Sequence, residues 1–358
     1  MKRHGNIFSK IITIDNLRLA HINARKGKTH YSEVQRVDKN PDYFLYKIQE
    51  MLLNKTYTTS EYNVFTIIDK GKEREIYKLP FYPDRIIHWA IMQQIECIFL
   101  NTFIDQTYAA LPNKGTHRAL YQMDEYMKKD KNGTQYCLKI DIKKFFPNID
   151  QETLKKMVRM KFKDKDLLWL LNDIISSSDS GIPIGNYLSQ YFGNFYLAYF
   201  DHWLKEEKGI RYYLRYMDDC VILHHDKDFL HQLKREMDEY LDVKLKLTIK
   251  GNWQVFPTYV RGVDYVGYRH FGDYILLRKS TAKNFKRKMG RILKRCEDDI
   301  EMTYSEWCSI NSYKGWIMHC DGYNLTEKYI KPLLPYAKNY YKEVIKNDSN
   351  RIRMESSR

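Results

Sequence analysis

The chain lacks any apolar run of 18 or more residues, and this excludes a transmembrane helix. Residues 1–7 contain no apolar segment long enough for a signal peptide, so we expect no secretory signal. None of the six cysteines belongs to a Cys-x-x-Cys pair, which argues against a zinc site, and their scatter is typical of reduced thiols. No internal repeat or low-complexity block occurs. These absences predict a cytoplasmic protein without membrane contact.

The composition favours a polyanionic partner. The 358 residues carry a formal net charge of +15 at pH 7. Nucleic acid is the simplest partner for such a charge. The 30 tyrosines can stack on bases, although most of them are expected to pack within the protein. Charge alone fits an ordinary basic protein equally well, so the motifs have to decide.

Two acidic signatures interrupt apolar, β-prone runs. Asp141 interrupts residues 138–146, and Asp218 and Asp219 interrupt residues 213–223. An unpaired buried charge is very costly, and a bound cation is one way to offset it. Two Mg²⁺ ions about 4 Å apart, held by carboxylates from two strands, are the machinery of nucleotidyl transfer. The alternative is a polar hairpin turn with an unrelated edge-strand aspartate, which two such contexts together make improbable.

The order of expected elements fits a split β-α-β palm, an antiparallel sheet backed by helices. A helix is expected to begin after Asp15 as its N-cap. The expected strands cover residues 62–80 with a turn at 69–72, then 138–142, a strand–turn–strand over 212–224, and strands over 243–250 and 259–269. The main helices cover residues 84–103, 186–205 and 229–241.

A basic segment follows the expected sheet. Residues 278–295 contain nine Lys or Arg and no acid, while Phe285, Met289, Ile292 and Leu293 recur at helical spacing. One apolar stripe on an otherwise basic helix indicates a module that docks on the protein and presents cations to a phosphate backbone. A merely solvated basic face is the alternative.

At these residues the chain resembles the reverse transcriptase superfamily, from about residue 62 to residue 322. Residues 138–150 match the first catalytic motif, residues 181–190 the segment that positions the incoming nucleotide, and residues 216–219 the metal-binding hairpin. Residues 265–268 are similar to the primer-gripping hairpin, and residues 313–316 and 320–323 to thumb elements of bacterial members. The resemblance implies an α+β right-hand polymerase with fingers, palm and helical thumb.

The resemblance also implies roles for individual residues. Asp141, Asp218 and Asp219 would be catalytic and would bind two Mg²⁺ ions, with Mn²⁺ as a substitute and with the backbone carbonyl of Ile142 as a further ligand. Phe146 would crowd a sugar 2′-hydroxyl, which favours DNA as the product and argues against an RNA-synthesising polymerase. The remaining implied contacts are to the nucleotide (Ile184, Gly185, Gln190, Lys72, Arg74 and Lys114), to the primer (Val266, Gly267 and Tyr268) and to the nucleic-acid backbone (Lys283, Lys286, Arg287 and Arg291).

The departures from the common family pattern indicate a subgroup. Many relatives read Pro-Gln-Gly-x-x-x-Ser-Pro, whereas here Ile184 replaces the Gln and Gln190 replaces the Pro. An Ile side chain cannot hydrogen-bond a nucleotide. The pattern is similar to that of diversity-generating retroelements, whose reverse transcriptases copy a template-repeat RNA with errors opposite adenines. Leu111 stands where many bacterial relatives have Arg, which weakens any expected triphosphate contact there.

The resemblance implies a bacterial or phage-encoded enzyme that binds template RNA, primer or cDNA, deoxynucleotides and a small basic accessory variability protein. Other stand-alone bacterial reverse transcriptases, of the phage-defence, retron or group II-like types, stay open as alternatives, as does a catalytically silent RNA-binding relative. We expect an N-terminal helical extension (1–60), fingers and palm (61–275), a helical thumb (276–346) and a disordered tail (347–358).

Overall fold

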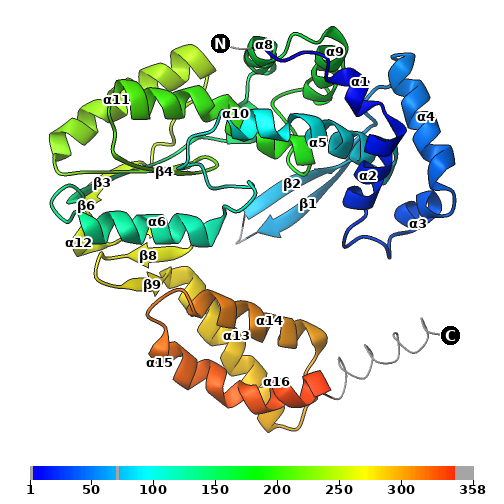
Figure 1. Cartoon of the computed structure of the whole chain (residues 1–358). Helices are drawn as coiled ribbons and strands as arrows, with labels where there is room; N and C mark the ends of the chain where they lie inside the picture. The colour runs from blue at the N-terminus through cyan, green and yellow to red at the C-terminus, as the bar shows by residue number, and fades with distance from the viewer. Residues whose placement is uncertain (1–2, 70–71, 343–358) are drawn as a thin grey trace. The chain divides into compact units, whose positions relative to one another are not determined.

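The computed structural model describes residues 3–69 and 72–342 (Figure 1). The expected tail lies outside the described residues. The chain forms two compact units, each built from segments that are far apart in the sequence. The first unit comprises the residues up to Gly115 together with Leu138–Ile222 and Asp228–Gln254. The second comprises Thr116–Cys137, Leu223–Lys227 and the residues from Val255 onward.

Most helices belong to the first unit. They are α1 (Phe8–Ile11), α2 (Ile14–Ala24), α3 (Ser32–Asp38), α4 (Pro41–Leu53), α5 (Ile86–Leu100), α7 (Phe145–Asn148), α8 (Gln151–Lys161), α9 (Lys165–Ile175), α10 (Tyr187–His202) and α11 (Lys227–Leu245), with short π-helical turns η1 (Phe81–Arg85) and η2 (Trp203–Glu207).

The predicted N-cap at Asp15 is wrong. Thr13 caps α2, because its side-chain oxygen accepts the N–H of Asn16, and Asp15 lies in the first turn.

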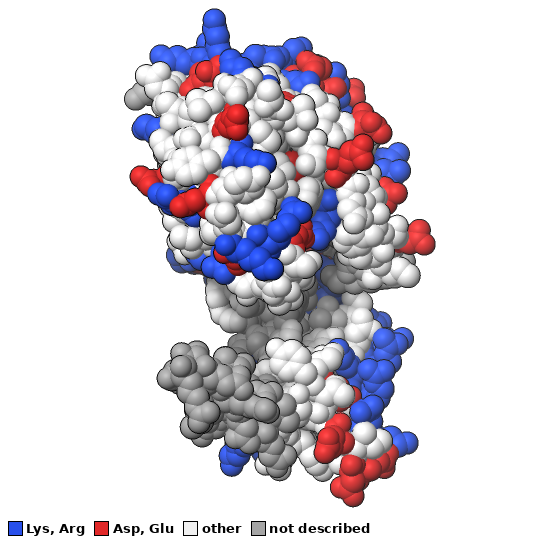
Figure 2. Space-filling model, turned by 90° about the vertical axis from the view of Figure 1, so that its right-hand side faces the viewer, with Lys and Arg blue, Asp and Glu red and all other residues white. Residues whose placement is uncertain are grey.

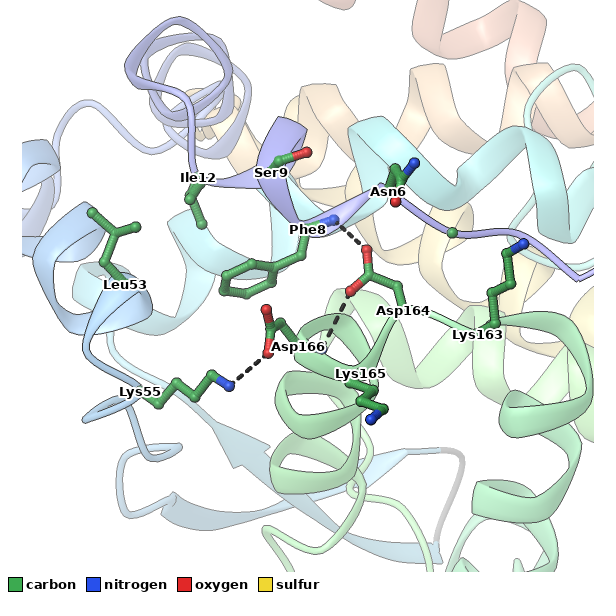
Figure 3. Close-up of a pocket in the computed structure, with 11 residues that line it drawn as sticks. Asn6, Phe8, Ser9, Ile12, Leu53, Lys55, Lys163, Asp164, Lys165 and Asp166 are labelled. Atoms are coloured by element: carbon green, nitrogen blue, oxygen red, sulfur yellow. Dashed lines mark hydrogen bonds and ion pairs between the residues drawn. The ribbon is translucent and has the colours of Figure 1, made fainter.

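The N-terminal segment is held to the start of α9 by one carboxylate. Asp164 accepts the backbone N–H groups of Ile7 (2.7 Å) and Phe8 (2.9 Å), where α1 begins (Figure 3). The same carboxylate caps its own helix by accepting the N–H groups of Asp166 and Leu167, each at 3.2 Å. A helix leaves its first N–H groups without intrahelical partners. Asp164 therefore supplies acceptors to two helix starts, and these bonds lower the pKa of the carboxyl although burial acts to raise it.

The expected hairpin over residues 62–80 is confirmed. Strand β1 (Asn63–Asp69) pairs antiparallel with β2 (Lys72–Lys78), in a register that sets Asp69 opposite Lys72. Residues 70–71, which fall within the turn expected over residues 69–72, lie outside the described residues. The two strands form a sheet of their own. A two-stranded ribbon is marginally stable alone, so its attachment to the protein matters.

The acidic signatures lie in a four-stranded sheet of order β4-β5-β3-β6. Its strands are β3 (Tyr136–Asp141), β4 (Tyr212–Tyr216), β5 (Asp219–His224) and β6 (Gln254–Pro257). The strand expected over residues 243–250 is wrong. Helix α11 continues to Leu245, because Leu241 and Leu245 extend its buried stripe by one turn, and only an isolated bridge joins Ile249 to Ile142.

The second unit combines a helix, a small sheet and a helical bundle. Its elements are α6 (Thr116–Lys129), α12 (Thr258–Arg261), β7 (Val263–Tyr265), β8 (Tyr268–His270), β9 (Ile275–Leu277), α13 (Lys279–Glu297), α14 (Tyr304–Ile317), α15 (Tyr323–Leu325), η3 (Thr326–Ile330), η4 (Lys331–Leu333) and α16 (Leu334–Tyr340). The strand expected over residues 259–269 is also wrong. Gly262, with a φ of 73°, ends α12, and the remainder divides into two short antiparallel strands.

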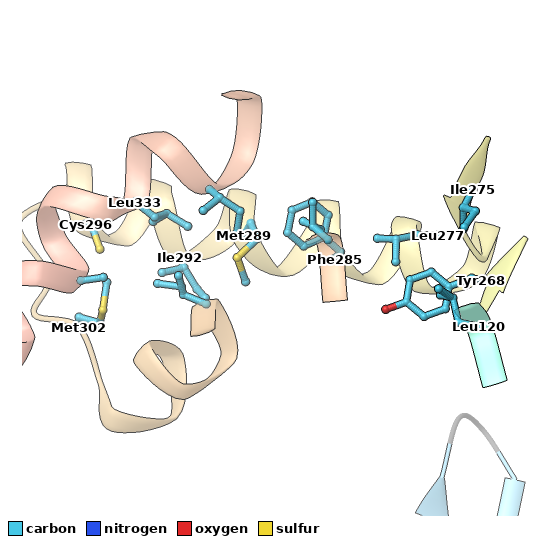
Figure 4. Packing of buried hydrophobic residues seen from close by; sticks show 14 residues of the cluster. Leu120, Tyr268, Ile275, Leu277, Phe285, Met289, Ile292, Cys296, Met302 and Leu333 are labelled. Atoms are coloured by element: carbon cyan, nitrogen blue, oxygen red, sulfur yellow. The ribbon is translucent and has the colours of Figure 1, made fainter. Parts of the chain in front are cut away.

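The apolar stripe expected on the basic segment is confirmed as the core of the bundle. Phe285, Met289 and Ile292 of α13 are fully buried in one cluster with Leu333 (Figure 4). Leu293, the fourth residue of the predicted stripe, is partly buried against it. The helix thus docks through its apolar side, which leaves its basic side outward. Among the described residues, no helix is both long and apolar enough to cross a membrane.

Candidate active site

The acidic turn lies between β4 and β5. Met217 and Asp218 are the two residues that connect these strands, and Met217 has a φ of 57°, in the left-handed region that non-glycine residues seldom adopt. The N–H of Ile142, directly after β3, donates to the carbonyl oxygen of Asp218 at 3.3 Å. This bond sets the turn beside the end of β3, where Asp141 lies. The structure therefore brings the two acidic signatures together, as the sequence predicted.

The carboxylates of Asp141 and Asp218 interact electrostatically. Burial and, second, the negative charge of Asp141 raise the pKa of Asp218 to about 6. The ammonium group of Lys250 contacts the Asp141 carboxylate, and that of Lys139 lies 3.2 Å from the carboxylate of Asp219. The site thus concentrates negative charge that protein cations only partly offset. A concentration of this kind favours a bound cation.

The two lysines were missed from the sequence. A usable signal for Lys250 was present, because Leu245, Leu247 and Ile249 alternate with polar residues and are buried. The segment does not form a strand, but the isolated bridge between Ile249 and Ile142 places Lys250 near the end of β3, where Asp141 lies. The backbone confirms this placement, since the N–H of Lys250 donates to the carbonyl of Asp141 at 2.8 Å.

The donor chemistry of the site fits Mg²⁺. In the part of the chain that the structure describes, no group of three or more His, Cys, Asp or Glu gathers as a ready-made metal site. Mg²⁺, however, is commonly held by only one or two carboxylates together with waters and substrate phosphates. The Asp141–Asp218 pair, with carboxylates close enough to shift a pKa, meets that requirement. The metal ligation by Asp141, Asp218, Asp219 and the Ile142 carbonyl remains a prediction.

Phe146 lies beside the acidic turn. It is half-buried at the start of α7, while its neighbour Phe145 is buried. Helix α10 passes close to both through Gly193. A Cβ atom at residue 193 would lie 3.2 Å from Cε1 of Phe146, 3.3 Å from Cε1 of Phe145 and 3.3 Å from the sulfur of Met217. The glycine therefore lets one helix support both the predicted sugar-contacting ring and the acidic turn.

The predicted nucleotide-positioning segment is attached to the β1–β2 hairpin. The carbonyl of Ile184 accepts the N–H of Tyr77 at 3.0 Å. Gly185 has a φ of 122°, and a Cβ there would lie 2.7 Å from the carbonyl oxygen of Tyr77, so only glycine fits. The side chain of Asn186 donates to the hydroxyl of Tyr62 at 2.9 Å. The sequence alone predicts no role for Asn186. Gln190 is exposed on α10.

The predicted fingers cations are only partly described. Lys72 and Arg74 lie on β2, and their side chains are outside the described residues. The ammonium group of Lys114 forms an ion pair with Asp105 and donates to the Asp105 carbonyl at 2.6 Å. Lys114 is thus engaged locally, and its predicted nucleotide contact stays a prediction.

The predicted primer and backbone contacts lie in the second unit. Val266 and Gly267 form the turn between β7 and β8, both with positive φ, and the hydroxyl of Tyr268 donates to the Trp316 carbonyl at 3.0 Å. A Cβ at Gly267 would lie 2.4 Å from the Trp316 ring.

The four predicted backbone-binding residues are exposed on α13, namely Lys283, Lys286, Arg287 and Arg291. Figure 2 shows basic side chains gathered along one edge of the lower helical body.

A hairpin turn that carries carboxylates lies beside the end of a third strand, β3, which itself ends in Asp141, and this arrangement is typical of a polymerase palm. The profile of the family "Reverse transcriptase (RNA-dependent DNA polymerase)" matches residues 61–270. The chain belongs to this reverse transcriptase family. The match includes the acidic signatures, the β1–β2 hairpin and the segment around Ile184.

Curated relatives match part of the chain. It is 27% identical over 173 residues to the group II intron-encoded protein LtrA of Lactococcus lactis subsp. cremoris, covering 45% of this chain and 28% of that protein. It is 27% identical over 138 residues to the putative COX1/OXI3 intron 2 protein of Saccharomyces cerevisiae, covering 35% and 15%. The chain thus spans less than a third of the length of these relatives. A solved apo telomerase from Candida tropicalis is similar with a TM-score of 0.46 and 13% identity, over 70% of this chain and 52% of that one.

Proposed function

We propose that this chain is an RNA-directed DNA polymerase that uses divalent metal ions held by Asp141 and Asp218. The observation that carries the proposal is the backbone and charge contact between these two signatures, 77 positions apart in the sequence. The Asp218 carbonyl accepts a bond from Ile142, and the charge of Asp141 contributes to the raised pKa of Asp218. A polar hairpin turn alone would not require a second carboxylate, from a separate strand, close to the carboxylate of the turn.

In the first unit, some residues would hold the metal ions and another would exclude ribonucleotides. Asp141 and Asp218 would hold Mg²⁺, which would lower the pKa of a primer 3′-hydroxyl and neutralise the triphosphate. The half-buried ring of Phe146 would leave no room for a 2′-hydroxyl and so would select deoxynucleotides. Lys250 and Lys139 offset part of the carboxylate charge. We further propose that the thumb helix α13 binds the nucleic-acid backbone through its exposed cations.

We also propose the diversity-generating type, in which a template-repeat RNA is copied with errors opposite adenines and a small basic accessory protein assists. The support comes from Ile184. Its main chain is fixed by the bond from Tyr77, so the residue has a defined place, yet its side chain offers no hydrogen-bonding group. A pocket that lacks one polar contact discriminates base pairs less strictly, because a buried polar partner left unpaired is what penalises a mismatch.

A primer-extension assay with cDNA sequencing tests both levels of the proposal. The purified chain is given Mg²⁺, a primed RNA template and four deoxynucleotides. Asp218→Asn should abolish incorporation with RNA binding retained, and near-normal synthesis would refute the site. Ile184→Gln should lower the error frequency opposite adenine relative to errors at the other template bases. An unchanged error spectrum in that variant would remove Ile184 from the explanation.

The intron-encoded relatives support a second candidate, a reverse transcriptase of group II intron type. This candidate shares the site and the metal chemistry but predicts accurate copying. The same sequencing separates the two, since uniformly low errors at all template bases favour the intron type. Errors concentrated at adenines favour the diversity-generating type.

A further inference from the structure

A buried charge pair lies directly beneath the acidic turn. Arg215 of β4 and Asp201 of α10 are both 0% exposed. The Nε of Arg215 donates to both carboxylate oxygens of Asp201 at 2.8 and 2.9 Å, and its Nη2 donates to one of them at 2.6 Å. Asp201 also accepts the hydroxyl of Tyr213 at 2.7 Å. Both charges therefore have complete partners inside the protein.

The guanidinium also reaches the turn itself. Its Nη1 donates to the carbonyl oxygen of Met217 at 3.0 Å and to the side-chain oxygen of Asn194 at 3.1 Å. Its Nη2 donates to the Asn194 carbonyl at 3.3 Å. Asn194 and Asp201 both belong to α10. One side chain thus joins the carbonyl before Asp218 to a long buried helix.

The turn needs such support. A non-glycine residue in the left-handed region is strained, and it persists only where surrounding contacts fix it. Met217 is in that region, directly before Asp218. Arg215 supplies such a contact, because its side chain donates a hydrogen bond to the Met217 carbonyl. Global stability does not explain the choice of an arginine, because well-packed apolar residues often stabilise a core as much as a buried ion pair does.

We propose that Arg215 is a positioning residue for divalent metal binding, which it serves by fixing the Met217 carbonyl and hence the Asp218 carboxylate. This inference rests on the proposed function, because it assumes that Asp218 binds the metal. Lysine would keep the charge pair with Asp201 but lacks the planar fork that reaches Asp201, Asn194 and Met217 at once. The role therefore requires the shape of the side chain as well as its charge.

The test measures Mn²⁺ binding to the full-length chain by the loss of the free-ion EPR signal, with Mg²⁺ half-saturation of primer extension as a second readout. Arg215→Lys should raise the Mn²⁺ concentration at half-saturation by about 10- to 100-fold, the usual effect of removing support from a metal ligand. Tyr213→Phe is the matched control. It removes a bond to the same Asp201 without contact to the turn, and should lower the urea midpoint while leaving Mn²⁺ binding at the wild-type value.

A second variant covers the case in which Arg215→Lys does not fold. Arg215→Met combined with Asp201→Leu replaces the buried pair by apolar groups, a change that often preserves folding. It should show the same loss of Mn²⁺ affinity with a normal urea midpoint. Wild-type Mn²⁺ binding in this double variant, or in a folded Arg215→Lys, would overturn the proposal. Asp218→Asn separates the two levels, because wild-type Mn²⁺ binding in that variant would overturn the metal site itself.

Discussion

Replacing Asp218 by Asn should stabilise the metal-free protein while it abolishes catalysis. Burial and the charge of Asp141 raise the pKa of Asp218 from 3.8 to about 6, so the folded chain holds a proton that the unfolded chain releases. Above the folded pKa the ionised side chain is disfavoured by about 3 kcal/mol, since each tenfold difference in proton affinity corresponds to about 1.4 kcal/mol. Asparagine has nearly the same shape and no charge, so it should recover much of that free energy.

The sign of the pH dependence follows from the raised pKa. Below the unfolded pKa both states are protonated, and the aspartate destabilises nothing. The penalty grows as the pH rises from the unfolded value of 3.8 toward about 6, and it is complete above that value. The advantage of Asp218→Asn should therefore fall from about 3 kcal/mol near pH 8 to a small fraction of that value near pH 4.

Urea unfolding in EDTA, followed by circular dichroism, measures the difference in unfolding free energy at each pH. Hydrogen exchange of the β4 and β5 amides locates the effect in the sheet. The wild type should gain stability when Mg²⁺ is added, because a ligand that binds only the folded state stabilises it, whereas Asp218→Asn should gain less. An asparagine variant that is less stable than the wild type near pH 8 in EDTA would refute the reasoning.

Three further outcomes are expected. Asp164→Asn should cost about 1–2 kcal/mol in urea unfolding near neutral pH, because a carboxylate that caps two helix starts is lost, and the difference should shrink as acid protonates the wild-type carboxyl, whose pKa is lowered by its backbone bonds. Phe146→Ala should let ribonucleotides compete in primer extension, and unchanged selectivity would show that the ring does not face the sugar. Tyr62→Phe should cost about 1 kcal/mol by removing the acceptor of Asn186, with a raised KM for deoxynucleotides, and an unaltered KM would dissociate that bond from nucleotide positioning.

The sequence predicted those parts of the fold that depend on local patterns. The β1–β2 hairpin followed from two β-prone runs around a turn. Both acidic signatures were found because charge within an apolar run is visible locally. Element ends were less predictable. Thr13 and Asp15 are both acceptable N-caps, and only the backbone geometry decides between them.

The residues that the sequence did not indicate act through contacts that are distant along the chain. Arg215 lies within the acidic signature 213–223, yet its partner Asp201 comes from the end of α10 and resembles any polar residue near a helix end. Asp164 bonds to residues more than 150 positions away. Lys250 reaches Asp141 across 109 positions. Hydrophobic periodicity specifies which face of a helix or strand is buried. It does not specify which polar group of another element a polar side chain on that helix or strand will contact.

Two charge systems lie next to each other in the first unit, and they are balanced in opposite ways. The Arg215–Asp201 pair is closed within the protein, with every contact supplied by fixed neighbours. The Asp141–Asp218 pair is not closed, because burial and mutual repulsion leave the pKa of Asp218 near 6 despite the contact between Lys250 and Asp141. Through Arg215 the closed pair also contacts the Met217 carbonyl, directly before Asp218. If the proposed metal site is correct, the open pair would exchange a proton for a cation, and the bond from Arg215 to the Met217 carbonyl would limit movement of the backbone during that exchange.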